Sequence, residues 1–167
     1  MPNKSDSARL PPRWFMRFFW SAHRGLYRLT RGRVGLWRPK PNGWGAMCLT
    51  TIGRRTGAER RVIVGYFEDG SNLVVMAMNG WDTAEPAWWL NLQAHPNVRV
   101  ELPDGPRLVT GRAAVGPERE QLWSRWREID KNLDAYARRR PDETAVVVFE
   151  PQDPGPARSI GAVASRR

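Results

Sequence analysis

The sequence contains one cysteine, two histidines and no long apolar run, and each scarcity excludes a class of protein. Cys48 alone can form neither an internal disulfide nor a cysteine-based metal site, which favours a reducing, cytoplasmic compartment. It lies in an apolar run and is interpreted as a small buried hydrophobe. His23 and His95 are far apart in the sequence and form no ligand pair, so no metal site is expected. The longest apolar runs fall well short of the roughly 18 residues that a membrane-spanning helix needs.

Catalytic signatures are also missing. The chain has no Gly-x-Gly-x-x-Gly, no His-Glu-x-x-His, no Cys-x-x-Cys and no Gly-x-Ser-x-Gly. Hydrolysis by a metal or by a nucleophilic side chain therefore has no visible machinery. A bound cofactor that supplies the reactive atom is compatible with this pattern.

The positive charge is concentrated at one end. Residues 1–40 hold ten of the 27 basic residues and one of the 17 acidic residues, so they carry +9 of the net +10. At 100° per residue, five arginines between Arg13 and Arg31 fall within an arc of roughly 60°, and aromatic and aliphatic residues occupy the other side. The segment from Arg13 to Thr30 is therefore predicted to be an amphipathic helix. Pro11 and Pro12 suit its start.

An arginine stripe beside an aromatic face is typical of a helix that lies on an anionic membrane, so residues 13–31 are a candidate for peripheral contact with the inner face of the cell membrane. The alternative is a helix that packs on its own domain or covers the active site. Nucleic acid is not expected as a partner because no known binding module follows the basic arm.

Three parts are expected: a basic arm and linker at residues 1–45, a folded domain at 46–151, and a disordered Pro/Gly/Arg tail at 152–167. Within the domain, apolar alternation and turn residues predict six short strands and three helices, which together favour a small antiparallel barrel with helical decoration. The predicted strands are Met47–Thr51, Arg60–Glu68, Leu73–Met78, Val98–Leu102, Arg107–Val115 and Thr144–Glu150, and the predicted helices are Pro86–Ala94, Pro117–Ile129 and Asn132–Arg139.

Residues 50–61, Thr-Thr-Ile-Gly-Arg-Arg-Thr-Gly-Ala-Glu-Arg-Arg, join the first two predicted strands. Glycines allow backbone N–H groups to approach an anion, and arginines bind phosphate oxygens through two donors at once. The segment is therefore a candidate anion site. A solvated basic hairpin is the simpler alternative.

A second segment, residues 78–92, runs from the end of a buried strand through Asn79-Gly80 into a helix with paired tryptophans. Such a junction can hold a flat ring, although Trp88, Trp89 and Leu92 are expected in large part to fill the core. In the late helices, Trp123, Trp126, Leu133 and Tyr136 have spacing that is typical of core residues. Tyr136 is also a candidate pocket wall or proton donor.

These segments resemble the deazaflavin-dependent nitroreductase family of actinobacteria. Leu49 to Gly57 is similar to the family's Leu-Thr-Thr-Thr-Gly-Arg-Lys-Thr-Gly, and Pro86 to Val98 to its Pro-x-Trp-Tyr-Leu-Asn-Leu-x-Ala-Asn-Pro-x-Val. The final Val-Val-Val-Phe-Glu-Pro matches as well. The resemblance implies a mainly β fold, a split β-barrel of the flavin-reductase type. It also implies coenzyme F420 as hydride donor and quinones, nitro compounds or activated alkenes as acceptors.

The resemblance implies cofactor-binding residues position by position: Arg54, Arg55, Thr56, Arg60, Arg61, Val62 and Ile63 for the anionic phospholactyl-glutamate tail, and Met76, Ala77, Met78, Asn79, Ala87, Trp88 and Asn91 around the ring. Asp130, Leu133 and Tyr136 stand where the best-known nitroreductase has three tyrosines on its substrate side. Efficient reduction of bulky nitroimidazoles is therefore not expected. A protein that binds F420 or a lipid without turnover, and a reductase that uses FMN, are the alternatives. A monomer or a weak homodimer is expected.

Overall fold

The computed structural model describes residues 35–80 and 82–152. The predicted amphipathic helix and the tail after residue 152 lie outside this range, so the predicted division into arm, domain and tail stays a prediction. No helix in the described part is long and apolar enough to cross a bilayer.

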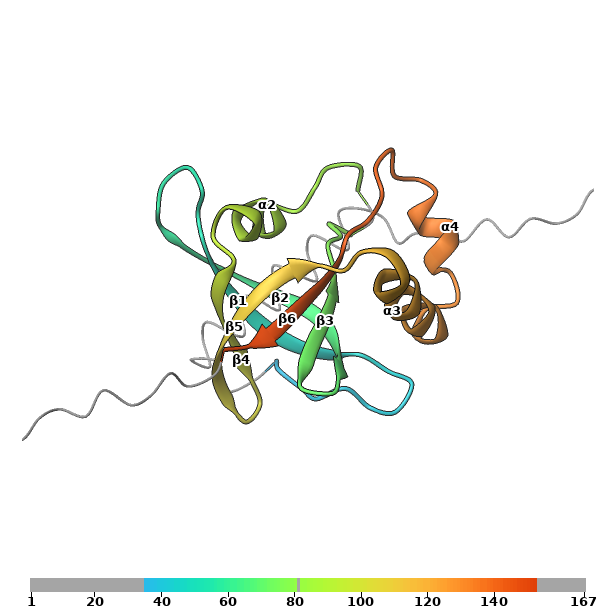
Figure 1. Ribbon diagram of the computed structural model, residues 1–167, viewed down its shortest axis with the longest axis horizontal. Helices are drawn as coiled ribbons and strands as arrows, with labels where there is room; N and C mark the ends of the chain where they lie inside the picture. Colours follow the sequence, from blue (N-terminus) through green and yellow to red (C-terminus); the bar gives the residue numbers. More distant parts are fainter. Residues whose placement is uncertain (1–34, 81, 153–167) are drawn as a thin grey trace, which may run out of the picture.

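Six strands and three helices make up the described domain (Figure 1). In chain order they are β1 (Gly45–Ile52), β2 (Glu59–Asp69), β3 (Asn72–Met76), α2 (Ala87–Ala94), β4 (Asn97–Leu102), β5 (Gly105–Ala113), α3 (Gly116–Ile129), α4 (Leu133–Ala137) and β6 (Val146–Pro151). Each predicted strand and helix is present, with shifted ends.

The strands form a closed antiparallel barrel in the order β1-β2-β3-β6-β5-β4, and pairing of β4 with β1 completes the ring. The predicted fold class, mainly β with about six strands and helical decoration, is confirmed. Alternate residues along each strand fill the interior, including Met47 and Leu49 of β1 and Val64 and Tyr66 of β2.

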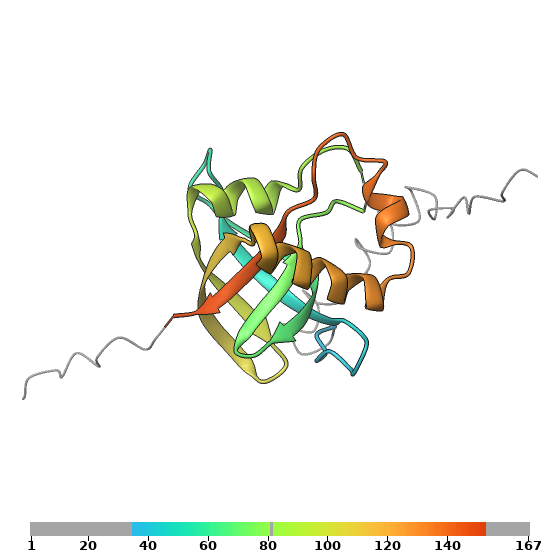
Figure 2. The same cartoon turned by 45° about the vertical axis from the view of Figure 1, so that its right-hand side comes forward.

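The outer face over β3 and β6 is covered by α3, whose Leu122 and Trp126 pack against Val74, Val146 and Val148 (Figure 2). This cover explains why β3 is apolar throughout: one side of it faces the barrel interior and the other faces a helix. Cys48 is buried on a different part of the outer face, beside Ala46 and Ile63, as expected of a small hydrophobe.

The helix α2 closes one end of the barrel, and the loop between β1 and β2 rises at the same end in both views (Figures 1 and 2). Trp88, Trp89 and Leu92 of α2 all belong to the barrel core, as predicted in large part from their spacing. A Cβ atom on Gly111 of β5 would lie 2.7 Å from Leu92 Cδ2, so glycine at this position allows the helix to sit directly on the strand.

Two of the shifted strand ends lie close to the predicted ring-binding residues. β3 ends at Met76 rather than Met78, because the Met78 N–H donates back to the Met76 carbonyl and turns the chain out of the sheet. β6 begins at Val146 rather than Thr144, whose side chain and carbonyl are both bonded to arginines. Both differences lie at the end of the barrel that carries α2.

Candidate active site

The loop between β1 and β2 is a compact turn. Gly53 donates to the Ala58 carbonyl at 2.8 Å, and Gly57 donates to the Gly53 carbonyl at 2.7 Å. Gly57 adopts a left-handed φ of 68°, which glycine tolerates without strain. The turn holds Arg54, Arg55 and Thr56 outward, and all three are exposed.

The arginines of this loop differ from those elsewhere in the fold. In the described part of the chain, no carboxylate lies within ion-pair distance of Arg54, Arg55 or Arg60. Most other arginines are paired with carboxylates: Arg38, Arg61, Arg99, Arg107, Arg112, Arg119, Arg125, Arg127 and Arg140. Three guanidinium groups, two on the turn and one at the start of β2, are thus left available to an external anion.

Asn91 of α2 joins the helix to this loop. Its Oδ1 accepts from the Arg54 backbone N–H at 3.1 Å and from the Arg54 Nη1 at 3.3 Å, and its Nδ2 donates to Thr51 Oγ1 at 3.4 Å. Asn91 is 5% exposed. The Asn91 amide was predicted to close the ring site. Its hydrogen bonds instead go to Arg54 and Thr51, and they orient Arg54.

Three predicted tail-binding residues have side chains that are occupied by the fold. Arg61 forms an ion pair with Glu101 on the outer face of the barrel. Val62 packs against the barrel core, and Ile63 is buried in the outer cluster with Cys48. These positions are therefore less available to a ligand than Arg54, Arg55 and Arg60.

The predicted ring-binding residues lie where β3 ends and α2 begins. Met76 and Ala77 are buried, one under α3 and one in the barrel, so a ligand would meet their main chain. Met78 is half-buried, and Asn79 is exposed in a turn where its carbonyl accepts from the Asp82 N–H at 3.1 Å.

At the start of α2, Ala87 is exposed, whereas Trp88 is 7% exposed and belongs to the barrel core. The two ends of the ring-side segment, Ala77 and Glu85, are bonded to one buried arginine, Arg140. The structure thus brings the predicted ring residues to one end of the barrel, beside the helix that holds Arg54.

The predicted substrate-side residues differ in their surroundings. Leu133 is fully buried in the cluster under α3, against which Met78 also packs. Asp130 is half-buried, and its Oδ1 accepts from the Asn132 N–H at 2.9 Å, which shapes the turn into α4. Tyr136 is half-buried beneath the Arg139 guanidinium, 5.8 Å from its ring centre. Of the three, Tyr136 is the one with a hydroxyl that can move a proton.

The carboxylate of Asp134 fastens α4 to α3. It accepts from the Trp123 indole N–H at 2.9 Å and pairs with Arg127. The hydrogen bond from Trp123, with the contribution of Arg127, holds the pKa of Asp134 below its ordinary value. The short helix α4, which carries Tyr136, is therefore held against α3 by the charged side chain of Asp134.

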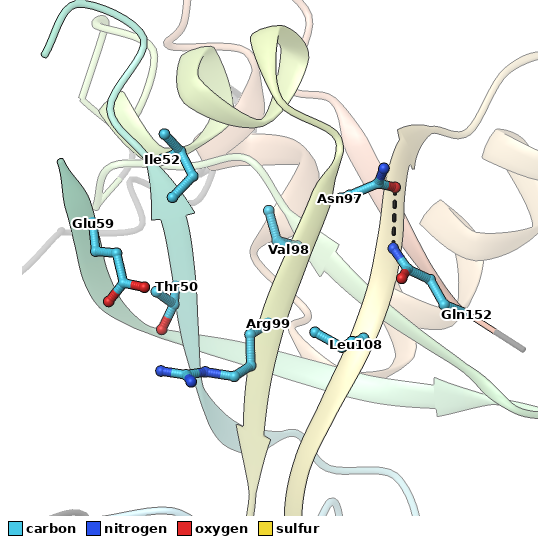
Figure 3. A pocket seen from close by; sticks show the side chains of 8 residues that line it. All are labelled: Thr50, Ile52, Glu59, Asn97, Val98, Arg99, Leu108 and Gln152. Atoms are coloured by element: carbon cyan, nitrogen blue, oxygen red, sulfur yellow. Dashed lines mark hydrogen bonds between the residues drawn. The ribbon is translucent and has the colours of Figure 1, made fainter. Parts of the chain in front are cut away.

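A cavity of about 260 Å³ lies elsewhere, on the outer face of the barrel (Figure 3). Its lining mixes charged, amide and apolar groups: Thr50, Ile52, Glu59, Asn97, Val98, Arg99, Leu108 and Gln152. None of these residues is among those predicted to bind the cofactor. Glu59 and Arg99 supply opposite charges to this cavity. It is therefore less suited to a polyanion than the β1–β2 loop, residues 53–58, which carries Arg54 and Arg55 and is called the arginine loop below.

Sequence reasoning did not identify Arg140 or Glu85. Arg140 ends the run Arg138-Arg139-Arg140, in which its two neighbours are exposed, and no local pattern distinguishes the buried one. Glu85 stands directly before Pro86. The proline indicated the start of a helix, but nothing nearby in the sequence indicated the ion pair of Glu85 with Arg140.

Comparisons with known proteins identify the family of the chain. A family model described as F420H(2)-dependent quinone reductase matches residues 20–151. An F420H(2)-dependent quinone reductase of Mycobacterium tuberculosis is 31% identical over 114 residues, which are 66% of this chain and 74% of the relative.

Two solved structures resemble the fold. An F420H2-dependent reductase has a TM-score of 0.57 at 27% identity and covers 63% of this chain and 93% of its own. A domain-swapped dimer has a TM-score of 0.61, also at 27% identity, and covers 84% of this chain and 100% of its own.

The resemblance to actinobacterial F420-dependent reductases is thereby confirmed, and the matching family is named for quinones rather than for nitro compounds. The family model spans most of the sequence, including all six strands and the arginine loop. The chain therefore belongs to the F420H(2)-dependent quinone reductase family and is an oxidoreductase that uses coenzyme F420.

Proposed function

We propose that this protein transfers a hydride from reduced F420 to a small organic acceptor, with quinones as the main class and nitro compounds or activated alkenes as further acceptors. The observation that carries the proposal is a set of three exposed arginines that have no carboxylate partner among the described residues: Arg54 and Arg55 on the loop beside α2 and Arg60 at the start of β2. The family match supports the quinone class.

The donor set suits the tail of the cofactor. A phospholactyl-glutamate tail carries several negative charges along its length, and separate guanidinium groups bind separate anionic groups through paired N–H donors. Thr56 adds a hydroxyl to the same turn. FMN carries a single phosphate, so three arginines without carboxylate partners exceed its needs, which disfavours an FMN-dependent reductase.

The ring is proposed to lie between the end of β3 and the start of α2, along Met76 to Asn79 on one side and Ala87 and Trp88 on the other. When bound, reduced F420 supplies the hydride from C5 of its deazaflavin, which accounts for the absence of a nucleophile or metal signature. The residues of the chain orient the ring and exclude water from it.

Reduction of a quinone by one hydride requires one proton to complete the hydroquinone. Tyr136 is proposed to hold that proton at its hydroxyl, on the α4 side of the site. Asp130 and Leu133 are proposed to shape the same side, Asp130 through the turn into α4 and Leu133 from within the core.

The test is a titration of the protein with F420 and, separately, with FMN, followed by oxidation of reduced F420 with menadione as acceptor. We expect F420 to bind, with an affinity that falls as ionic strength rises, and menadione to be reduced. Binding without turnover would support the non-catalytic alternative. Binding of FMN alone would support the FMN alternative.

Two variants test where the anionic tail of F420 binds. Arg55→Ala removes a guanidinium without a carboxylate partner from the loop, and Arg99→Ala removes one from the cavity of Figure 3. We expect the affinity for F420 to fall in the first and to remain in the second. The reverse result would place the tail in the outer cavity.

Contact with an anionic membrane through residues 13–31 is a second proposal. Those residues lie outside the described part of the chain, but Trp37 and Trp44 follow them, 38% and 42% exposed, with ring centres 5.1 Å apart. Exposed tryptophans are frequent at membrane interfaces. Cosedimentation of the full chain with anionic vesicles, but not with neutral ones, is expected. If the protein remains in the supernatant with both, the proposal is wrong.

A further inference from the structure

Arg140 is a fully buried arginine at the end of the barrel that carries the candidate site. Its side chain is 0% exposed. Nη1 donates to the Ala77 carbonyl and to Thr144 Oγ1, each at 2.9 Å, and Nη2 donates to Glu85 Oε1 at 2.8 Å. One guanidinium therefore holds the residue after β3, the residue before Pro86 and the approach to β6.

The two contacts with Ala77 and Glu85 matter most, because Ala77 belongs to the β3 side of the proposed ring site and Glu85 lies two positions before Ala87 on its α2 side. The described residues between them, 78–80 and 82–84, belong to no strand or helix. Arg140 bonds the residues at both ends of this segment, Ala77 and Glu85, through one planar guanidinium group. The distance between the end of β3 and the start of α2 is thereby set by a rigid fork.

Stability alone is a weak reason for such an arginine. Desolvation of a buried ion pair offsets much of its Coulomb attraction, and apolar replacements of similar volume are often neutral or stabilising. In the described part of the chain, Arg140 Nε and Glu85 Oε2 are buried without a hydrogen-bond partner, so the pair is incompletely satisfied. The Arg140 guanidinium fixes the relative position of Ala77 and Glu85, which an apolar side chain would not do.

We infer that Arg140 is a positioning residue for hydride transfer: through Ala77 and Glu85 it sets the wall against which the deazaflavin ring is oriented. The inference rests on the proposed function, since it requires the ring to occupy this end of the barrel. Arg140 acts through the segment it holds, without contact with the acceptor.

The test compares Arg140→Met, Arg140→Lys and Glu85→Gln with the wild type. The control is Arg125→Met, which removes an arginine that also bonds a carboxylate, Asp69, and a backbone carbonyl, that of Glu68, but on α3 away from the site. For each protein, the affinities for F420 and for the deazaflavin chromophore without its tail are measured, together with kcat, KM for reduced F420 and the melting temperature.

For Arg140→Met we expect affinity for both ligands to fall by the same factor and kcat to fall on the order of tenfold to a hundredfold, since small misplacements of a reacting group have effects of that size. Arg140→Lys keeps the charge but not the fork and is expected to recover part of the loss. Arg125→Met is expected to keep kcat and KM. Glu85→Gln supplies the same comparison if Arg140→Met does not fold.

Several results would overturn the inference. If Arg140→Met and Glu85→Gln lower only the melting temperature and leave kcat, KM and both affinities unchanged well below it, Arg140 is merely structural. If Arg140→Met weakens F420 but not the tail-less chromophore, Arg140 acts on the tail and not on the ring. If the wild type binds neither ligand, the proposed function fails and the inference fails with it. If the wild type binds both ligands normally, the proposed function stands, and the results for the variants test the inference alone.

Discussion

Asn91 accepts two hydrogen bonds from Arg54, one from its backbone N–H at 3.1 Å and one from its guanidinium at 3.3 Å. The two residues are 37 positions apart and lie on different elements, a loop and a helix. Because the same amide also donates to Thr51, a single buried side chain sets both the backbone and the charged group of the arginine loop.

Asn91→Ala is expected to lower the free energy of unfolding by about 1–3 kcal/mol, because it removes the three hydrogen bonds of a buried amide. It is also expected to weaken F420 binding by loosening Arg54. Urea denaturation and fluorescence titration measure the two effects. Asn97→Ala, at an exposed asparagine bonded to Thr110 and Gln152, is the control and should leave F420 binding intact. Unchanged F420 affinity in Asn91→Ala would show that Arg54 needs no support.

Gly111→Ala is expected to destabilise the protein by about 1–3 kcal/mol through overpacking. The new methyl group would lie 2.7 Å from Leu92 Cδ2 and 2.9 Å from Phe149 Cε1, both in the packed core. Chemical denaturation measures the effect. Gly43→Ala is the control, since its nearest neighbour would lie 3.6 Å away. Equal stability of both variants and the wild type would mean that α2 can shift on β5 without cost.

Tyr66→Phe is expected to leave stability unchanged or to raise it. The Tyr66 hydroxyl is buried in the barrel and has no hydrogen-bond partner in the described residues. Removal of an unsatisfied polar atom from a core of the same shape avoids its desolvation cost. Denaturation at neutral pH gives the answer, and a loss above about 1 kcal/mol would reveal a partner for the hydroxyl.

The same substitution has an alkaline signature. Burial, with a contribution from Glu68, raises the pKa of Tyr66 from 10.0 to about 12. Between these values the unfolded chain loses this proton and the folded chain keeps it, so Tyr66 lowers stability as the pH rises. The Tyr66→Phe variant should therefore lose less stability than the wild type over that range. Parallel curves would contradict the raised pKa.

Glu118→Gln is expected to reduce the loss of stability in acid. Two hydrogen bonds from Arg112, at 2.7 and 2.8 Å, hold the pKa of Glu118 below its ordinary value. A lowered folded-state pKa stabilises the fold above the ordinary value, and this contribution is lost as the pH falls through the folded-state pKa. The difference between wild type and variant should shrink as the pH falls below the ordinary value of 4.5, by a small amount because the pair is partly exposed. Glu120→Gln, at an exposed position of the same helix, is the control.

Much of the fold could be predicted from local patterns. Apolar patterns and turn residues located all six strands, and Gly70, which has a left-handed φ of 60°, lies in the turn between β2 and β3. The ends of β3 and β6 could not be predicted, because β3 ends at a turn in which Met78 bonds Met76, and the start of β6 follows Thr144, which Arg119 and Arg140 bond. Local sequence carries no information about a partner of that kind.

The site was predictable only in part for the same reason. The arginine loop is one continuous segment, so its charge and its glycines were visible in the sequence. The bonds from Arg140 to Glu85 and Ala77 span 55 and 63 positions. The side chains of Val62 and Ile63 point to opposite faces of one strand, as the period of two requires, and both are taken up by packing.

Ring closure has a consequence for self-association. Each of the six described strands has a paired neighbour on both sides, so no strand of the described barrel is an edge strand along its whole length. Side-chain contact between surfaces and the exchange of whole segments of chain are two routes of association that need no such edge strand. The domain-swapped dimer among the structural neighbours is an example of the second route in a related fold.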